Sequence, residues 1–351
     1  MSKRDIGTDD PRVRVRPGKG TRPRTKIRPD YSDCPEGFIF SVDRGRYHVR
    51  FEDRLLMAVK SRELGRGSIV VGDVVKLNGD LSGRKDTLAR IVSVNERSSV
   101  LRRSGEDADT KGREKTMVAN ADNVVIVTAM TNPPVRPGFI DRCLVAAYDA
   151  HMRPIVCLTK ADLGDPDNVI SLCESLGVTT VISSNQEGHE HQFGYEKLIE
   201  LISGQTSVLI GHSGVGKSTL INAILPEAER LTGDVNQVTG RGRHTSTNMI
   251  ALELPEGGWI IDTPGIRGFG LAHVEPDTVI DAFPELEDAI EDCPRSCNHL
   301  ESAVDCGLDA WVKAGADEAD AVYRANRLAS IRRLLESLKT AQEKPWETVR
   351  D

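Results

Sequence analysis

The sequence predicts an α/β protein made of three parts: an N-terminal β-barrel, a parallel sheet with helices on both faces, and a small helical C-terminal domain. Three observations predict this architecture. Short alternating strands with turn residues between them fill residues 36–104, buried strands alternate with helices over residues 123–202, and a cluster of cysteines follows residue 290. A chain of 351 residues is long enough for two or three such domains.

The composition is that of a soluble protein whose charge is unevenly distributed. The net charge is −7, yet residues 1–30 carry ten Lys and Arg against four Asp. We expect residues 1–35 to form a disordered basic arm, which either binds a polyanion or acts only as a solubilising tail. No stretch reaches the ~18 apolar residues of a membrane span, and the N-terminus has no apolar signal region. We therefore expect a cytoplasmic protein with no membrane contact.

Residues 36–104 predict a small barrel of the OB-fold type. Strand-like segments follow one another at near-regular spacing, at 37–42, 46–51, 55–60, 69–77 and 88–94. OB-folds bind single-stranded nucleic acid through basic grooves and stacked aromatic rings. Two alternatives, stacking on bases and filling the barrel core, are open for Phe38, Phe40, Tyr47 and Phe51, which lie near Arg44, Arg46 and Arg50. The charged segment 102–115 is expected to be a linker.

A parallel sheet with helices on both faces is predicted next. Buried strands at 123–129, 154–158, 178–182 and 207–210 alternate with helices at 141–151, 168–176, 195–202 and 218–225. Ligands of such sheets bind beyond the carboxyl ends of the strands. Polar segments 159–162, 183–184 and 211–218 each follow a strand directly, so we expect them to converge on one ligand.

Residues 211–218 match G-x-x-x-x-G-K-[ST], the phosphate-binding P-loop. Glycines let consecutive N–H groups point at one anion. Lys217 is expected to reach the β- and γ-phosphates, and Ser218 to hold Mg²⁺. The alternative is a glycine-rich turn that matches by chance, which the flanking strand and helix disfavour. The predicted phosphate-binding residues are Gly211, His212, Ser213, Gly214, Val215, Gly216, Lys217, Ser218 and Thr219.

The segment Thr159-Lys160-Ala161-Asp162 resembles the guanine-specificity element Asn-Lys-x-Asp. The Asp162 carboxylate can accept from N1–H and from the N2 amino group of guanine, a donor pair that adenine lacks. The stem of Lys160 is expected to lie along the base, and Thr159 keeps a side-chain hydroxyl where Asn is common. Ser183 and Ser184, at the end of the next strand, are expected to bind the same nucleotide. Beside a P-loop, this segment indicates GTP and GDP as ligands.

The remaining nucleotide elements follow the P-loop. Asp262-Thr263-Pro264-Gly265 has the Asp-x-x-Gly pattern, in which Asp262 holds Mg²⁺ through water and the N–H of Gly265 meets the γ-phosphate. The polar segment 240–247 has the place of a switch loop, where either Thr245 or Thr247 binds Mg²⁺; an ordinary surface connection is the alternative. Standard GTPases place the P-loop first and the guanine element late. This order predicts a circular permutation.

The C-terminal cysteines have metal-ligand spacing. Cys293, Cys297, His299 and Cys306 give C-x3-C-x-H-x6-C among the seven cysteines of the chain. Three thiolates and one imidazole predict a closed, tetrahedral structural Zn²⁺ site, with buried unliganded thiols as the alternative.

Residues 318–342 then predict a long helix. Its apolar positions at helical spacing are Ala319, Val322, Ala325, Leu328, Ile331, Leu335 and Leu338. Two alternatives, contact with RNA phosphates and a solvated helix face, are open for Arg324, Arg327, Arg332 and Arg333.

With these motifs in this order, residues 36–325 resemble the circularly permuted, ribosome small-subunit-dependent GTPase A family. The resemblance implies an OB-fold at 36–104, a circularly permuted GTPase domain at 105–275 and a zinc-binding C-terminal domain at 276–351. It also implies a GTP hydrolase and molecular switch that acts in late maturation of the small ribosomal subunit and is stimulated by that subunit. Ile266 stands where other GTPases have a catalytic Gln, and the switch-loop His of the family corresponds to His244. The expected catalytic residues are thus His244 and Lys217, although His244 alternatively caps a loop.

The expected partners are GTP or GDP, the small ribosomal subunit and its rRNA, with the protein itself a monomer. A second function is open: an RNA-binding assembly scaffold that uses GTP only as a stabilising ligand. Lys217, Ser218 and Asp262 favour the hydrolase, because a scaffold has no physical need for Mg²⁺ ligands.

Overall fold

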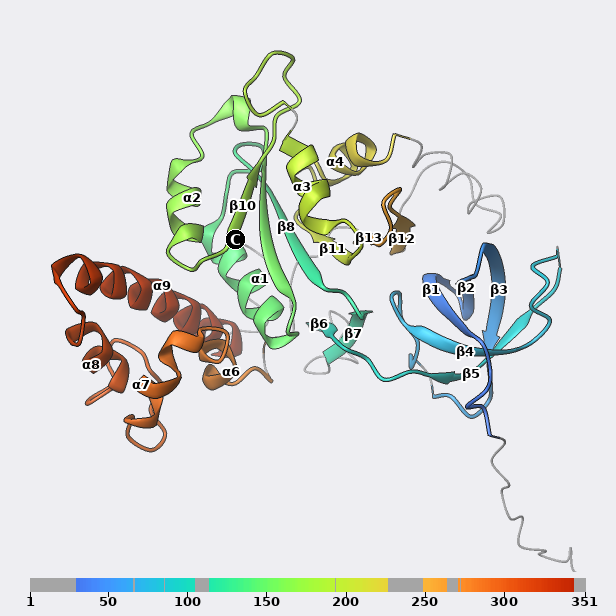
Figure 1. Ribbon diagram of the computed structural model, residues 1–351, viewed down its shortest axis with the longest axis horizontal. Helices are drawn as coiled ribbons and strands as arrows, with labels where there is room; N and C mark the ends of the chain where they lie inside the picture. The colour runs from blue at the N-terminus through green and yellow to red at the C-terminus, as the bar shows by residue number, and fades with distance from the viewer. Residues whose placement is uncertain are drawn as a thin grey trace, which may run out of the picture. The chain divides into compact units, whose positions relative to one another are not determined.

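The computed structural model describes residues 30–104, 114–226, 249–263, 271 and 273–343, except for the single positions 66, 85 and 193 (Figure 1). All helices and strands described below lie in one compact unit, residues 34–351. The division of this unit at residues 104 and 275 stays a prediction, and the proposed basic arm lies almost wholly outside the described residues. Within the described part of the chain, no helix is long and apolar enough to cross a membrane.

The N-terminal strands close into a five-stranded barrel, which confirms the predicted OB-fold. The strands are β1 (Glu36–Asp43), β2 (Arg46–Phe51), β3 (Arg54–Lys60), β4 (Val74–Gly79) and β5 (Ala89–Val94). β1, β2 and β3 pair antiparallel, β3 pairs parallel with β5, and β4 joins β5 to β1. Fully buried Ile39, Val49, Leu77 and Ile91 fill the interior.

The predicted strand 69–77 is shorter in the structure and begins only at Val74. A turn interrupts it, because the Asp73 carboxylate accepts from the N–H of Val70 at 2.8 Å. Gly72 has φ +93°, and a Cβ there would lie 2.0 Å from the Ala119 carbonyl oxygen. Only glycine fits this close approach.

Part of the predicted linker 102–115 is a hairpin instead. β6 (Val100–Ser104) pairs antiparallel with β7 (Glu114–Ala119). Leu101 and Val118 face each other across the pair and are fully buried. Arg102 and Arg103 give β6 a charged sequence that does not predict a strand. Its partner strand begins only at Glu114.

The central sheet has the predicted alternating topology. Parallel strands β10 (Thr179–Ile182), β9 (Arg153–Thr159), β8 (Asn123–Ala129), β11 (Thr206–Ile210) and β13 (Trp259–Asp262) lie in this spatial order. One face packs against α1 (Pro137–Asp149) and α2 (Asp167–Glu174), and the other against α3 (Gly194–Ile202) and α4 (Lys217–Ile224). The fully buried residues of β8 show why its sequence is a continuous apolar run.

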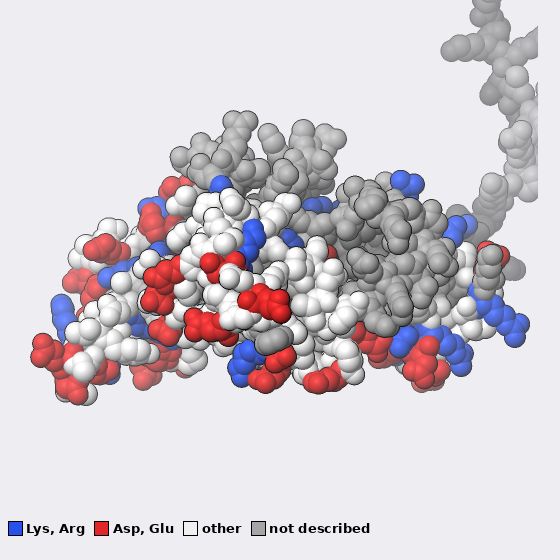
Figure 2. All heavy atoms as spheres, turned by 90° about the horizontal axis from the view of Figure 1, so that it is seen from above, with Lys and Arg blue, Asp and Glu red and all other residues white. Residues whose placement is uncertain are grey.

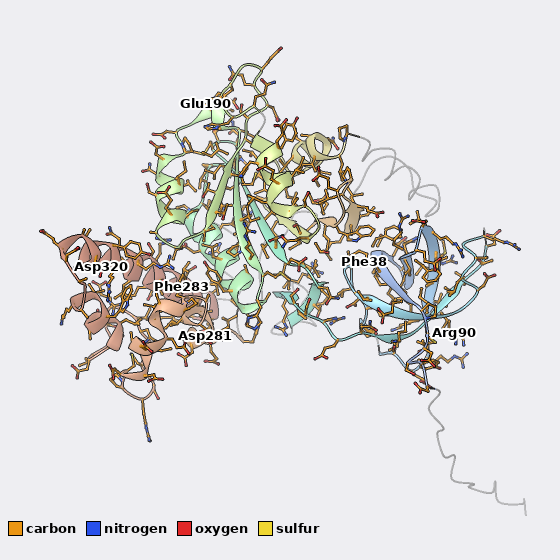
Figure 3. The ribbon with its side chains drawn as sticks, in the orientation of Figure 1. Phe38, Arg90, Glu190, Asp281, Phe283 and Asp320 are labelled. Atoms are coloured by element: carbon orange, nitrogen blue, oxygen red, sulfur yellow. The ribbon has the colours of Figure 1, made fainter. Side chains whose placement is uncertain are left out.

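A short antiparallel strand, β12 (Ile250–Glu253), joins this sheet to the barrel. β12 pairs with β13 and forms one bridge to β1, between Ile250 and Ser41. The ring of Phe38, which Figure 3 labels, stacks on Trp259 with centroids 4.5 Å apart. Arg50 pairs with Glu253 at 2.9 Å. Phe40 and Tyr47 are buried, so core packing accounts for these two rings, whereas Phe38 packs outside the barrel.

The C-terminal part consists of α6 (Pro276–Ile280), η2 (Pro284–Leu286), α7 (Glu287–Glu291), α8 (Gly307–Lys313) and the long α9 (Glu318–Glu343). α9 buries Leu328, Ile331, Leu335 and Leu338 as predicted, but Val322 is 56% exposed because the first turns of the helix extend beyond the core. Phe283 is buried against Tyr148 of α1, with ring centroids 5.4 Å apart (Figure 3).

The arginines of α9 have a role that neither alternative anticipated. Three of them form ion pairs with other elements: Arg327 with Glu285, Arg332 with Asp309 and Arg333 with Asp141. Arg324 pairs with Asp320 within α9 and donates to the Trp311 carbonyl of α8. Two of their partners lie on other elements of the C-terminal part, and Asp141 lies on α1. These guanidinium groups therefore join α9 to its neighbours.

Candidate nucleotide and metal sites

A cavity of about 860 Å³ opens at the carboxyl ends of the central strands. It brings together the P-loop, the Thr-Lys-x-Asp segment, the Ser-Ser pair and the Asp-x-x-Gly aspartate, as expected for one ligand site. Its lining comprises Pro133, Arg136, Thr159, Lys160, Ser183, Asn185, His212, Ser213, Gly214, Gly216, Lys217, Ser218, Thr219, Leu220, Ala223 and Asp262.

The P-loop connects β11 to α4 in a conformation that requires its glycines. Gly214 and Gly216 have φ of +83° and +94°, and a Cβ on Gly211 would lie 2.3 Å from the Val127 carbonyl oxygen. α4 begins at Lys217, directly after Gly216. The loop therefore places the N-terminus of a helix at the cavity, which is the usual geometry of a phosphate site.

Lys217 and Asp262 are two side chains of opposite charge that are largely buried at the P-loop. The Nζ atom of Lys217 donates to the carbonyl oxygens of Gly211 and His212. Burial lowers the pKa of Lys217, while the nearby Asp262 opposes this shift. Burial likewise raises the pKa of Asp262, while Lys217 opposes that shift. Each residue thus favours the charged form of the other.

The Asp262 carboxylate fits a magnesium site. Its Oδ1 atom is buried and has no hydrogen-bond partner among the described residues. A buried carboxylate oxygen without a partner is costly, and a cation would relieve that cost. Asp262 and Ser218 line the same cavity, so their oxygens are available to one hard cation.

Side chains of the Thr-Lys-x-Asp segment form hydrogen bonds to the P-loop and to the loop that follows β8. The Thr159 hydroxyl donates to the Val215 carbonyl of the P-loop at 2.6 Å. Lys160 has φ +55°, and its Nζ atom donates to the carbonyls of Thr131 and Asn132. Thr159 thus makes a bond to the P-loop, which its sequence motif does not predict.

Asp162, the aspartate predicted to recognise guanine, accepts a hydrogen bond from one residue of the Ser-Ser pair. The buried Ser184 donates its hydroxyl to Asp162 Oδ1 at 2.5 Å. This hydrogen bond lowers the pKa of Asp162, so the carboxylate stays an acceptor. Ser183 is also buried, and the next residue, Asn185, lines the cavity.

Several predicted site residues lie outside the described residues: His244, Thr245, Thr247, Gly265 and Ile266. Their roles stay predictions. Conversely, the structure adds lining residues that the motifs did not include: Pro133, Arg136, Asn185, Leu220 and Ala223. Asn185 could have been found from its place after Ser184, whereas Arg136 belongs to no sequence motif.

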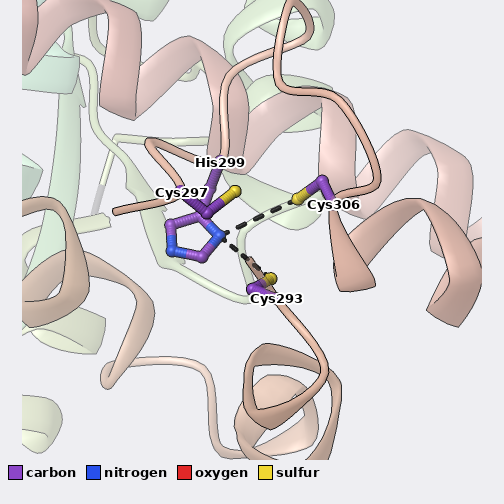
Figure 4. A group of neighbouring side chains, drawn as sticks. All are labelled: Cys293, Cys297, His299 and Cys306. Carbon is purple, nitrogen blue, oxygen red and sulfur yellow. Dashed lines mark hydrogen bonds between the residues drawn. The ribbon is translucent and has the colours of Figure 1, made fainter. Parts of the chain in front are cut away.

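The predicted metal ligands form a compact cluster (Figure 4). The ligand atoms of Cys293, Cys297, His299 and Cys306 all lie within 4.8 Å of one another. His299 Nδ1 is 3.6 Å from the Cys293 sulfur and 3.8 Å from the Cys306 sulfur. The Gly307 N–H donates to the Cys293 sulfur at 3.2 Å. Three sulfurs and one imidazole nitrogen converging in this way fit a tetrahedral metal ion.

The glycine after the last cysteine is required by this arrangement. A Cβ on Gly307 would lie 2.0 Å from the Ala289 carbonyl oxygen and 3.3 Å from the Cys293 sulfur. The close packing of α8 against α7 thus brings Cys306 to the other ligands.

A P-loop and a Thr-Lys-x-Asp segment that face one cavity on a parallel sheet define a P-loop nucleotide-binding protein with the site elements of GTPases. Residues 94–272 match the family model described as RsgA GTPase. A relative from Chlorobaculum parvum, named small ribosomal subunit biogenesis GTPase RsgA, is 33% identical over 314 residues, which are 86% of this chain and 97% of that protein. The chain belongs to the RsgA GTPase family.

Further comparisons agree with this assignment. A protein of the same name from Ectopseudomonas mendocina is 38% identical over 237 residues, which span 66% of each chain. The crystal structure of YjeQ from Thermotoga maritima has 26% identity and a TM-score of 0.58, covering 86% of this chain and 98% of that one. The crystal structure of YloQ, described as a circularly permuted GTPase, has 22% identity and a TM-score of 0.56 over 86% and 96%. The likeness to YloQ supports the permuted fold.

Proposed function

We propose that the protein is a GTP hydrolase and molecular switch in late maturation of the small ribosomal subunit, which binds rRNA and is stimulated by that subunit. The observation that carries the proposal is the junction that the Thr159 hydroxyl makes with the Val215 carbonyl of the P-loop, at the cavity that Thr159 and Lys160 line. This junction ties base recognition to phosphate binding. The names of the relatives from Chlorobaculum and Ectopseudomonas support the choice of the small subunit.

The residues predicted for the nucleotide site divide the binding of GTP among them. Asp162 accepts hydrogen bonds from the guanine edge, with Lys160 along the base and Ser183 and Ser184 supporting the aspartate. The P-loop N–H groups and Lys217 hold the phosphates. Ser218, one of Thr245 or Thr247 and, through water, Asp262 would hold Mg²⁺, which would neutralise the charge that develops on the phosphates during hydrolysis.

The reaction transfers the γ-phosphoryl group of GTP to water. A water oxygen forms a bond to the γ-phosphorus while the bond to the β–γ bridging oxygen breaks, which leaves GDP and phosphate. Lys217 stabilises the charge on the transferred group. His244 orients the water, because Ile266 has no group that can do so. Gly265 contributes its N–H to the γ-phosphate, and its release after hydrolysis frees the segment that leads into the C-terminal part.

The barrel supports a role in RNA binding. Between residues 36 and 104, Lys and Arg outnumber Asp and Glu by fourteen to nine. Arg90, at the barrel in Figure 3, is exposed. In Figure 2, acidic side chains spread over much of the visible face and blue side chains gather toward the side where Figure 1 places the barrel. Polyanion binding is therefore more favourable at the barrel than on the acidic part of the surface.

The cysteine–histidine cluster is proposed to hold one structural Zn²⁺, through Cys293, Cys297, His299 and Cys306. Its function is to stabilise short helices that have little apolar core of their own. We further propose that the protein is a cytoplasmic monomer.

The test is GTP hydrolysis with and without purified small ribosomal subunits. The expected result is slow turnover alone and a large stimulation by the subunit. His244→Ala is expected to lose the stimulated turnover and to keep GTP affinity. Binding to the subunit without any stimulation would favour the alternative function, an RNA-binding scaffold in which GTP is only a stabilising ligand.

A further inference from the structure

The loop between β8 and α1 is fixed against the nucleotide cavity at both of its ends. At its start, the Lys160 ammonium group donates to the carbonyls of Thr131 and Asn132, at 3.1 Å for Thr131. Just after its end, in the first turn of α1, the ring centroid of Phe139 lies 4.3 Å from that of the P-loop residue His212. The base-recognition segment and the P-loop therefore both position residues 131–139.

Arg136 lies in the middle of this fixed segment and lines the cavity. Its backbone is extended, and its carbonyl accepts from the N–H groups of Phe139 and Ile140, which starts α1. Its side chain is exposed and makes no capping hydrogen bond. Among the residues that the structure describes, no hydrogen bond or ion pair occupies its guanidinium group. A preformed loop thus presents an unengaged cation to the site.

We propose that Arg136 binds a phosphate group of the guanine nucleotide, as a second cation beside Lys217. The inference rests on the proposed function, since it takes a guanine nucleotide as the ligand. The phosphate chain carries all the negative charge of that ligand. A guanidinium group is always charged and matches phosphate oxygens with paired N–H donors. Among the described residues that line the cavity, Asp262 is the one with a carboxylate, and it already has Lys217 as a charged neighbour.

Arg136 belongs to none of the sequence motifs of the site. Its place is set by Pro137 at the first helical position, so its function is visible only once α1 is placed against the P-loop. Because the side chain is exposed, its contact is expected to contribute at the low end of charge-assisted hydrogen bonds.

The experiment compares binding of GDP and of guanosine to the full chain, with guanosine measured in competition against a fluorescent GDP analogue. Arg136→Gln is expected to weaken GDP about tenfold and to leave guanosine affinity unchanged, because guanosine has no phosphate. The GDP affinity of Arg136→Lys should lie between those of the unmodified chain and of Arg136→Gln. The salt dependence of GDP binding should also become shallower in the Gln variant. Arg153→Gln is the matched control, since Arg153 is exposed at the start of β9, away from the carboxyl ends of the strands.

The possible outcomes distinguish a failure of this inference from a failure of the proposed GTPase function. Equal losses of GDP and guanosine affinity would assign Arg136 a structural role and overturn the inference. Unchanged GDP affinity in Arg136→Gln would overturn it as well, while the GTPase function would stand. If the unmodified chain bound no guanine nucleotide, the proposed function itself would fail.

Discussion

The imidazole of His299 bridges the cysteine sulfurs and the carboxylate of Asp277. Its Nδ1 atom faces the sulfurs, and its Nε2 atom lies 3.4 Å from Asp277 Oδ1. Asp277 belongs to α6, whereas the cysteines lie on later segments. A carboxylate behind a metal-binding histidine fixes the ring orientation and makes the ligand nitrogen more basic.

Removing this carboxylate is expected to weaken metal retention. Asp277→Ala should release zinc to a chelator about tenfold faster, the low end of the range for such outer ligands, because the Asp277 side chain is mostly exposed. The measurement is zinc transfer to a coloured chelator, followed over time with the folded chain. Asp281→Asn, on an exposed residue just after the same helix, should behave like the unmodified protein. Identical release rates for both variants would leave Asp277 without this role.

The ion pair between Arg333 and Asp141 is expected to hold α9 on α1. Arg333 Nε lies 3.1 Å from a carboxylate that is almost fully buried. Arg333→Met would leave that carboxylate without its cation and should lower the free energy of unfolding by about 3 kcal/mol, the low end for a buried pair, because the Arg333 side chain is 34% exposed. Denaturant unfolding measures this change. Arg90→Met, on the exposed arginine of the barrel, should change stability by less than about 0.5 kcal/mol.

The same pair predicts a pH dependence. Burial raises the pKa of Asp141, and Arg333 only partly opposes this. The folded state therefore binds the proton more tightly than the unfolded state, so the contribution of Asp141 to stability falls as pH rises from about 4 through the raised pKa. Asp141→Asn should flatten that part of the stability–pH profile. A profile that keeps its full slope in this variant would contradict the assignment.

The Thr159 hydroxyl is expected to keep the P-loop in register with the base-recognition segment. Thr159→Val preserves the shape of the side chain but removes the donor to the Val215 carbonyl. GDP affinity should fall about tenfold, since one hydrogen bond of this kind is worth about 1 kcal/mol and its loss also misplaces the loop. Thr159→Ser retains the hydroxyl and should bind GDP nearly as well as the unmodified chain. Equal binding by the Val variant would show that the bond is dispensable.

Thiol reactivity should follow burial and metal binding. Burial raises the pKa of Cys157 to about 12 and of Cys173 to about 11, and it raises the pKa of Cys143 further. These buried thiols carry almost no reactive thiolate near pH 8. A thiol reagent should therefore label only Cys34 in the native, metal-loaded chain. After a chelator is added, the half-buried Cys293 and Cys297 should also react, but more slowly than Cys34, because burial raises their pKa too.

Denaturant should expose all seven cysteines. Cys34→Ser provides the control and should bring the native count to zero. Rapid labelling of Cys143 or Cys157 in the native state would show that the core opens more readily than the structure indicates.

The sequence predicted the elements whose pattern is local and missed those that depend on distant partners. The P-loop and the apolar run of β8 can be recognised in a few consecutive residues. β12 has only four residues, and its place becomes clear only beside β13 and β1. The short helices α6 and α7 likewise have too few turns for a periodic pattern.

The candidate site divides in the same way. Thr159, Asp162 and Lys217 can be assigned to one nucleotide site from their motifs alone. The bond from Thr159 to Val215 and the approach of Arg136 depend on how α1 and the strands pack, which residue spacing does not report. Similarly, Arg333 and Asp141 are far apart in the chain, so no local pattern joins them.

The placement of β11 between β8 and β13 has a consequence for how the protein is made. The P-loop strand takes one neighbour from before it in the chain and the other from Trp259–Asp262. During synthesis, the P-loop leaves the ribosome before the strand that completes its sheet. A nascent or prematurely terminated chain that ends before Asp262 therefore carries the whole P-loop sequence without the strand that supports it. We expect such fragments to capture no nucleotide, so that only chains translated past this strand enter the pool that competes for GTP.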